Sequence, residues 1–318
     1  AAQRDSGPAL EEGYITTPDG VRLYYVKAGR GARTVILPAR LFTFDDFRWL
    51  AEDYTLISYD MRNRGRSETV ADGSLITFEA DGEDLETIRR YFKIEKFSAI
   101  GYSYLGKLIV IYAMQHPERI ERLIQIGPVP LTFDTDYPKH FTAQREMPDE
   151  LRKPLRDMRA RNYHLTHPRE YCEEEWKVFR GGLVGDPAHM EKLGPSQCDM
   201  PNEWPMNLVR HMRLHFQESA QKHTVPREQI AQVKAPVLTI HGMLDRNAPY
   251  GAGREWCLLL PNARLLTVQN AAHQVFAEYP EIVRPAVRAF LAGQWPPAAE
   301  KVGALDPGAA AGATPQRN

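Results

Sequence analysis

The chain has 318 residues, of which 43% are hydrophobic and 25% are charged, so it can bury one large core. Its 40 basic and 41 acidic residues give a net charge of -1, which argues against the strong one-sign charge of nucleic-acid and anionic-membrane binders. The longest apolar run, residues 108–114, is far shorter than the roughly 20 residues that span a bilayer. We therefore expect no membrane span and no nucleic-acid partner.

The compartment and the cysteine chemistry are left open by the sequence. The chain begins Ala-Ala-Gln, which fits either a mature secreted or periplasmic form after signal removal or a trimmed cytoplasmic chain. Cys172, Cys198 and Cys257 show neither the spacing of a zinc site nor a disulfide framework, so no metal is expected. We interpret them as small buried hydrophobic residues. In an exported protein, Cys172 and Cys198 would alternatively form one disulfide.

Short strand-like runs alternate with helical stretches over the first 130 residues, which predicts βαβ units around a mostly parallel sheet. The turn Pro18-Asp19-Gly20 predicts a hairpin between the first two strands. The sheet should therefore open antiparallel and continue parallel. The predicted strands cover residues 14–17, 22–27, 34–38, 55–59, 97–100 and 122–126, and the predicted helices cover 44–52, 78–91 and 104–116.

A long stretch without strand-like runs interrupts this alternation. Residues 128–226 are rich in proline, charge and helix-forming sequence, which predicts a helical insertion or cap. The alternation then resumes, with strands at 235–241 and 264–267 and helices at 252–260 and 280–291. The core is thus expected in two parts, residues 1–127 and 227–294. Residues 295–318 are rich in Pro, Ala and Gly, which predicts a flexible or surface-draped tail.

A strand, a sharp turn and a helix are predicted around Gly101-Tyr102-Ser103-Tyr104-Leu105-Gly106. A serine at such a turn sits in a strained backbone that lifts its hydroxyl above the sheet, and small flanking residues allow strand and helix to approach. The pattern G-x-S-x-G is broken at Leu105, because the second glycine stands at Gly106. Taken alone, a serine in this position is more often a helix N-cap than a nucleophile.

Partners for a nucleophilic serine follow later in the chain. A serine hydroxyl needs a histidine to accept its proton, and the histidine needs a carboxylate to fix its tautomer. Asp245 and His273 each follow a predicted parallel strand, at the sheet edge where such sites gather. His241 is a rival base, but it precedes Asp245 on the same loop and is interpreted as shaping that turn. His211 and His215 are interpreted as surface or pocket-lining residues.

These residues together resemble the α/β-hydrolase superfamily, in which the chain order is nucleophile, acid, histidine. Ser103, Asp245 and His273 follow that order, and residues 60–67 (DMRNRGRS) resemble the family loop D-x-R-G-x-G-x-S with Asn63 in place of one glycine. The resemblance implies an α/β-hydrolase fold, with a mostly parallel central sheet flanked by helices and an inserted helical cap.

An oxyanion hole needs two backbone N–H donors, each contributing roughly 3 kcal/mol to transition-state stabilisation. Tyr104, directly after the nucleophile, is predicted to supply one. The family's second donor follows a His-Gly pair at the end of the third strand, but this chain reads Pro38-Ala39-Arg40-Leu41 there. Because Pro38 has no N–H, we predict Leu41 as the second donor, with Arg40 as the alternative. The Arg40 side chain is interpreted as a solvated loop cation rather than a binder of an anionic substrate group.

The predicted cap gives two opposing indications of substrate. Its aromatic and sulfur side chains suggest either an apolar chamber or the core of the cap itself; they are Tyr171, Trp176, Phe179, Trp204 and Met206. The Gly-Tyr-Ser-Tyr elbow and long lid resemble the proline iminopeptidase-like branch, in which lid carboxylates bind a free amino terminus. Residues 173–175, three glutamates, are the counterpart, but such a run usually faces solvent. The peptidase specificity is therefore not transferred.

We expect a serine hydrolase that acts on a small-molecule ester, or on the amide of an N-terminal residue in a short peptide, through an acyl-Ser103 intermediate. Ester cleavage is preferred, and the covalent intermediate requires no cofactor. Aminopeptidase-like cleavage, acyl transfer and carbon-carbon bond hydrolysis are alternatives with the same triad. A non-catalytic ligand-binding protein of the same fold is the alternative from another class. The acyl group, the leaving group and the oligomeric state stay open.

Overall fold

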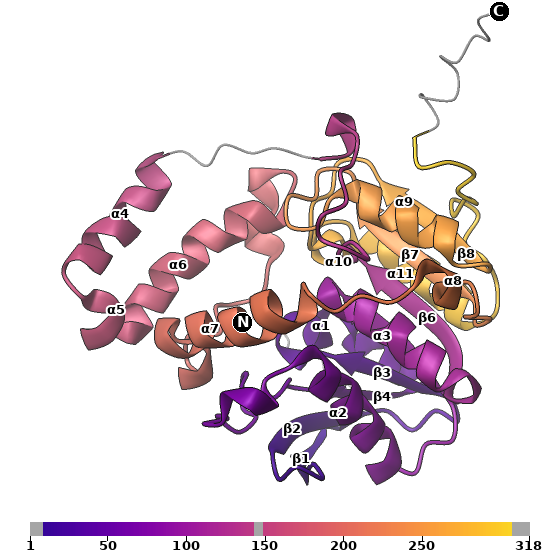
Figure 1. Cartoon of the computed structure of the whole chain (residues 1–318), viewed down its shortest axis with the longest axis horizontal. Helices are drawn as coiled ribbons and strands as arrows, with labels where there is room; N and C mark the ends of the chain where they lie inside the picture. Colours follow the sequence, from indigo (N-terminus) through magenta and orange to yellow (C-terminus); the bar gives the residue numbers. More distant parts are fainter. Residues whose placement is uncertain (1–8, 143–148, 307–318) are drawn as a thin grey trace, which may run out of the picture.

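An eight-stranded sheet forms the centre of the protein (Figure 1). The computed structural model describes residues 9–142 and 149–306. The strand order is β1-β2-β4-β3-β5-β6-β7-β8; β1, β2 and β4 pair antiparallel, and β3 to β8 run parallel. The predicted mostly parallel sheet with an antiparallel start is confirmed. The strands are β1 (Glu11–Thr16), β2 (Arg22–Ala28), β3 (Thr34–Pro38), β4 (Thr55–Tyr59), β5 (Phe97–Tyr102), β6 (Ile120–Ile126), β7 (Val237–Gly242) and β8 (Ala263–Val268).

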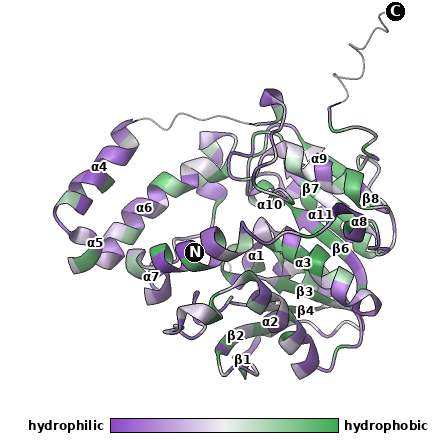
Figure 2. Ribbon diagram, in the orientation of Figure 1, coloured by the Kyte–Doolittle hydropathy of each residue, from purple (hydrophilic) through white to green (hydrophobic). Residues whose placement is uncertain are grey.

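Helices cover both faces of this sheet. Along β3, Val35 and Leu37 pack into one core and Ile36 into the other, because successive side chains of a strand point to opposite faces. α2, α3, α8 and α9 close the core on the Ile36 side, and α1, α10 and α11 close the other. These helices are α1 (Arg40–Phe47), α2 (Phe78–Tyr91), α3 (Tyr104–Gln115), α8 (Arg227–Ile230), α9 (Tyr250–Leu259), α10 (Val275–Glu278) and α11 (Pro280–Leu291). Figure 2 shows the hydrophobic residues gathered in the central strands and α3.

Residues 128–226, called here the inserted segment, leave the sheet after β6. In its described part all regular structure is helical, and α4, α5 and α6 lie together away from the sheet (Figure 1). A disulfide joins Cys172 to Cys198 within this segment, whereas Cys257 in α9 is a buried free thiol. The interpretation of all three as unpaired residues is thus corrected for two of them. The main helices are α4 (Asp149–Ala160), α5 (Tyr163–Thr166), α6 (Pro168–Leu183) and α7 (Pro205–His211), and α7 continues as a π-helical stretch, Met212–Ala220.

The structure defines the course of two predicted segments, a helix and the tail. The helix expected at 44–52 begins at Arg40 instead, directly after Ala39, whose backbone is left-handed (φ 63°), and residues 48–52 form a 3-10 helix. Within the predicted flexible or surface-draped tail, residues 295–306 include a segment that lies against the edge of the sheet. Leu265 of β8 and Glu300 exchange backbone hydrogen bonds of 2.9 Å, since an edge strand offers unpaired N–H and C=O groups. Residues 307–318 lie outside the described residues.

Of the helices within residues 9–142 and 149–306, none has the length and apolar character that a membrane span requires.

Candidate active site

Ser103 stands at the sharp turn between β5 and α3. Its backbone has φ 58° and ψ -126°, a region that residues other than glycine rarely adopt and that costs of order 1–3 kcal/mol. Its N–H donates to the carbonyl of Ile126 at 2.9 Å, which ties the turn to the end of β6. Within the described residues its side chain makes no hydrogen bond that caps α3. The hydroxyl is therefore not engaged as an N-cap.

The shifted glycine of the elbow is accommodated by close packing on both sides of the turn. A Cβ on Gly101 would lie 2.3 Å from the carbonyl oxygen of Leu105, so only glycine fits there. A Cβ on Gly106 would approach Pro128 at 3.1 Å, where α3 passes the end of β6. Leu105 itself is buried in the core. Strand and helix thus approach as closely as the motif requires although the second glycine is displaced by one residue.

The structure brings Asp245 and His273 together. Asp245 lies on the loop after β7 and His273 on the loop after β8, and His273 Nδ1 is 2.7 Å from Asp245 Oδ2. The backbone N–H groups of Asn247 and Ala248 donate to the other carboxylate oxygen, at 2.8 and 2.9 Å. These contacts fix the carboxylate and, through it, one edge of the imidazole ring.

Asp245 is held in its charged form although it is fully buried. Burial alone would raise its pKa, but the charge of His273 and hydrogen bonds from His241 and His273 outweigh it and hold the pKa well below the usual range. His241 Nε2 also lies 3.0 Å from the carbonyl oxygen of Ala248. His241 therefore braces the acid's loop, and it is not among the residues that line the cavity described next.

A cavity of about 470 Å³ opens above the carboxyl ends of the strands. Ser103 and His273 both line it, so the nucleophile candidate and the base candidate face one space. The inserted segment closes it with Phe179, Leu183, His211, Met212, His215 and Phe216. In the described part of the chain, no group of three or more His, Cys, Asp or Glu residues is arranged to hold a metal ion.

Both predicted oxyanion donors lie at this cavity. Tyr104 is the first residue of α3 and Leu41 is the second residue of α1, and both line the cavity. First-turn N–H groups of a helix have no partner within the helix, so they are suited to stabilise negative charge. Arg40, the alternative donor, begins α1 but is not among the lining residues. The lining favours Leu41, and its role stays a prediction.

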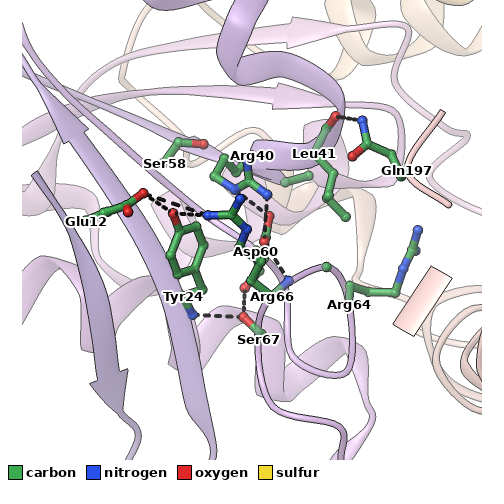
Figure 3. Close-up of polar contacts among 12 residues, drawn as sticks. Glu12, Tyr24, Arg40, Leu41, Ser58, Asp60, Arg64, Arg66, Ser67 and Gln197 are labelled. Atoms are coloured by element: carbon green, nitrogen blue, oxygen red, sulfur yellow. Dashed lines mark hydrogen bonds and ion pairs between the residues drawn. The ribbon is translucent and has the colours of Figure 1, made fainter. Parts of the chain in front are cut away.

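The interpretation of Arg40 as a solvated loop cation is wrong, because its side chain is paired within the protein. Its guanidinium bonds both carboxylate oxygens of Asp60, at 2.9 and 3.0 Å, and stacks over the ring of Tyr24 (Figure 3). Asp60 is completely buried, so the charge it carries requires an opposite charge nearby. Asp60 also accepts from the N–H of Arg66 at 2.9 Å, which holds the loop after β4 in place.

A second buried ion pair joins this loop to the inserted segment. Arg64 and Glu203 form two hydrogen bonds, at 2.9 and 2.6 Å, and the N–H of Gly65 donates to the same carboxylate at 2.9 Å. This pair could not be recognised from the sequence, because its members are 139 residues apart. His211 and His215, interpreted as surface or pocket-lining, are only 2% and 1% exposed and line the cavity.

A second cavity of about 540 Å³, called here the inner chamber, is lined mainly by the inserted segment and shares Phe42, Arg64, Phe179, Met212 and Asn247 with the first. Trp176, the disulfide and Glu175 line it. Of the three glutamates interpreted as solvent-facing, Glu175 thus faces a chamber, and burial raises its pKa. Among the aromatic and sulfur residues singled out, Tyr171 is buried and Met206 is 60% exposed.

The chain is similar to several known proteins of one fold family. The chain is 23% identical over 289 residues to a bifunctional esterase/perhydrolase of Acinetobacter calcoaceticus, covering 88% of this chain and 99% of the relative. It is 22% identical to a Mycoplasma pneumoniae protein provisionally named proline iminopeptidase, covering 80% and 85%. The solved structure of an esterase from Exiguobacterium antarcticum superposes with a TM-score of 0.65 at 17% identity, covering 89% of this chain and all of that one. Residues 46–280 match the pattern of the alpha/beta hydrolase fold, and the chain belongs to that family.

Proposed function

We propose that this protein is a serine hydrolase that cleaves carboxylic esters. Ser103 is the nucleophile, His273 is the general base and then the general acid, and Asp245 is the carboxylate that orients His273. One combination carries the proposal. A serine in a strained strand-to-helix turn faces the same cavity as a histidine whose other edge is bonded to a buried carboxylate. The alternative role of Ser103, as the N-cap of α3, would require a capping hydrogen bond from its side chain, and the described residues show none.

The reaction follows from these positions. The contact with Asp245 places a proton on His273 Nδ1, which leaves Nε2 unprotonated and able to accept the proton of the Ser103 hydroxyl. The serine oxygen attacks the ester carbonyl, and the resulting oxyanion accepts hydrogen bonds from the backbone N–H groups of Tyr104 and Leu41. His273 returns its proton to the departing alcohol. Water, deprotonated by His273, then attacks the acyl-Ser103 ester, releases the carboxylic acid and restores the serine.

Ester cleavage is supported by the character of the cavity and by the relatives. The lining is mainly apolar, which suits the hydrocarbon part of an ester. The names of the Acinetobacter relative and of the Exiguobacterium structure both include esterase.

Cleavage of an N-terminal amide is less well supported. It requires a charged carboxylate to bind the substrate's ammonium group, and Glu175 is the glutamate of residues 173–175 that lines the inner chamber. Burial raises the pKa of Glu175 and so disfavours the charge that an ammonium partner needs. Glu174 is paired with Lys177 at 2.8 Å, and Glu173 accepts from Ser196 at 2.7 Å.

The proposal is tested by a turnover screen of p-nitrophenyl esters of increasing acyl length beside prolyl and alanyl arylamides. We expect ester hydrolysis, and a loss of at least about a thousand-fold in Ser103→Ala. Unchanged ester turnover in Ser103→Ala would refute the mechanism. Arylamide cleavage that disappears in Glu175→Gln would assign the peptidase activity instead, and product analysis separates hydrolysis from acyl transfer to an added alcohol.

A further inference from the structure

Two histidines of the inserted segment line the cavity but have no part in the reaction described above. His211 ends α7 and His215 lies one turn further on, and their rings stack at 5.0 Å with an angle of 8°. The ring of His215 meets the ring of Tyr104 edge-on at 5.1 Å, directly beside the nucleophile in sequence. His215 Nε2 is engaged by Asp81 at 2.5 Å. The pair therefore forms a rigid wall of the cavity.

The tautomer of His211 is fixed by Asn63. The Asn63 side-chain oxygen accepts from the N–H of Val70 at 3.0 Å, so its amide nitrogen must be the atom that faces His211 Nδ1, at 3.4 Å. An amide nitrogen only donates, and Nδ1 therefore accepts. A neutral ring with an accepting Nδ1 carries its proton on Nε2. Burial first, and then the charges of Arg64, His215 and Arg210, hold the pKa of His211 well below its ordinary value and keep the ring neutral.

Asn63 is suited to this task by its backbone. It has φ 60°, a left-handed conformation that asparagine tolerates better than most residues and that glycine adopts without strain. The family loop has glycine here, but glycine has no amide to donate. Asn207, one turn before His211, donates to the carbonyl of Asn63 at 3.1 Å, so α7 is aligned on the same residue.

The second ring nitrogen of His211 has no protein partner in the described ranges, and the ring lines the cavity. We propose that His211 is a specificity-determining residue whose Nε2–H donates a hydrogen bond to a substrate oxygen other than that of the scissile carbonyl. Because the neighbouring guanidinium of Arg64 is already paired with Glu203, the cavity suits a neutral acceptor such as a ketone. The preferred ester thus carries a second, uncharged carbonyl oxygen. This inference rests on the proposed esterase function.

The preference has a physical basis in the cost of an unmade hydrogen bond. A purely hydrocarbon ester would cover Nε2–H without offering an acceptor, which leaves a buried donor unpaired. An ester with a well-placed oxo group should therefore be hydrolysed about ten-fold to a hundred-fold more efficiently than its hydrocarbon counterpart.

Matched substrates and variants test this preference. One set of p-nitrophenyl esters carries a 4-, 5- or 6-oxo group on the acyl chain, and a second set of alkyl esters carries the oxo group on the alcohol. Each is compared with its hydrocarbon counterpart. At least one oxo ester should have a higher kcat/KM than its hydrocarbon counterpart. His211→Phe, which keeps a flat ring against His215, should lower the ratio of these two kcat/KM values about ten-fold. Met212→Leu, a change in the same wall without a hydrogen-bonding group, should preserve it.

The tautomer is tested separately by nitrogen NMR of protein with labelled histidine. The proton of His211 should reside on Nε2 in the wild type. In Asn63→Asp, whose carboxylate accepts where the amide donated, it should move to Nδ1 and the oxo preference should fall.

The outcomes separate the two proposals. If no ester is hydrolysed, the esterase function fails. If esters are hydrolysed but no oxo ester is preferred, if His211→Phe leaves the ratio unchanged, or if wild-type His211 carries its proton on Nδ1, the assignment of His211 is overturned.

Discussion

Gly127 lies against the Asp245–His273 hydrogen bond at the end of β6. Its backbone has φ 51°, and a Cβ there would approach Asp245 Oδ2 at 3.0 Å and His273 Nδ1 at 3.2 Å. Only glycine combines that backbone with that space. The position of the two side chains thus depends on a residue that takes no part in the chemistry.

Gly127→Ala should lower kcat for the ester by on the order of a hundred-fold, because the added methyl group displaces the acid or the histidine. Gly20→Ala is the matched control. Gly20 also has a positive φ, 91°, but the space around its Cβ is open. Both variants should lose about 1–2 kcal/mol of stability from the left-handed backbone, measured by chemical denaturation. Equal kcat values for the two variants would contradict the role given to Gly127.

That Ser103, Asp245 and His273 lie at one edge of the sheet was predictable, because each follows a strand and the carboxyl ends of parallel strands meet at the same edge. Arg40 was misread because its partner, Asp60, follows a different strand and the pairing of distant charges is not visible in one sequence. In the sequence, Asn63 could be recognised only as a departure from the family loop, which has glycine at this position. Its meaning depends on His211, 148 residues away, which only the fold brings near.

At the scale of elements, the inserted segment is attached to the core by buried polar contacts. Arg64 and Glu203 connect the loop after β4 to the turn before α7. Lys107 of α3, itself buried, donates to the carbonyl oxygens of Leu131 and His223, at 3.0 and 2.6 Å, near the two ends of the segment. The loss and return of strand-like runs in the sequence led to the predicted limits of the segment, residues 128–226. The sequence did not predict these contacts, because they form between loops without periodicity.

Glu203→Gln should destabilise the protein by about 3–5 kcal/mol, because it leaves the charge of Arg64 buried without a partner. The double variant Arg64→Met/Glu203→Met should lose less free energy of unfolding than the sum of the losses in Arg64→Met and Glu203→Met, as measured in a double-mutant cycle. Glu218→Gln breaks the exposed pair of Arg213 and Glu218 and should cost no more than about 1 kcal/mol. A similar loss in both single glutamine variants would show that burial of the first pair has no energetic consequence.

The pair of Arg64 and Glu203 also makes the stability of the protein depend on pH. Burial raises the pKa of Glu203, but the charge and hydrogen bonds of Arg64 outweigh it, and the net pKa is lowered from 4.5. The stability it contributes is present above the unfolded-state pKa and is lost as the pH falls. The difference in free energy of unfolding between wild type and Glu203→Gln should therefore shrink below pH 4.5. A difference that stays constant down to acid pH would contradict the assignment.

At the scale of the whole molecule, two adjoining cavities lie between a regular sheet and an irregular helical segment. The shared wall residues belong to both parts, so the shape of the inner chamber depends on how the inserted segment is held. The disulfide between Cys172 and Cys198 lines that chamber and closes a loop whose ends are 26 residues apart. Fold class was predictable from alternating strands and helices, whereas the chamber depends on packing within a segment that has no repeating pattern.

Replacing both Cys172 and Cys198 with alanine should lower the free energy of unfolding by about 3 kcal/mol, because the cross-link restricts the unfolded chain. Reductant should lower the unfolding midpoint of the wild type and leave that of the double variant unchanged. Cys257→Ala is the control for loss of a buried sulfur atom, and it should stay sensitive to reductant. A wild-type midpoint that does not respond to full reduction would show that the bridge adds no stability.

The central claim is that Ser103 is the nucleophile activated by His273, and covalent labelling tests it most directly. A fluorophosphonate probe, which reacts with activated serines, should add one mass to the intact wild-type protein, and peptide mapping should locate it on Ser103. Labelling should be abolished in Ser103→Ala and strongly slowed in His273→Ala. Continued stoichiometric labelling of Ser103→Ala, or labelling of the wild type at another serine, would contradict the account.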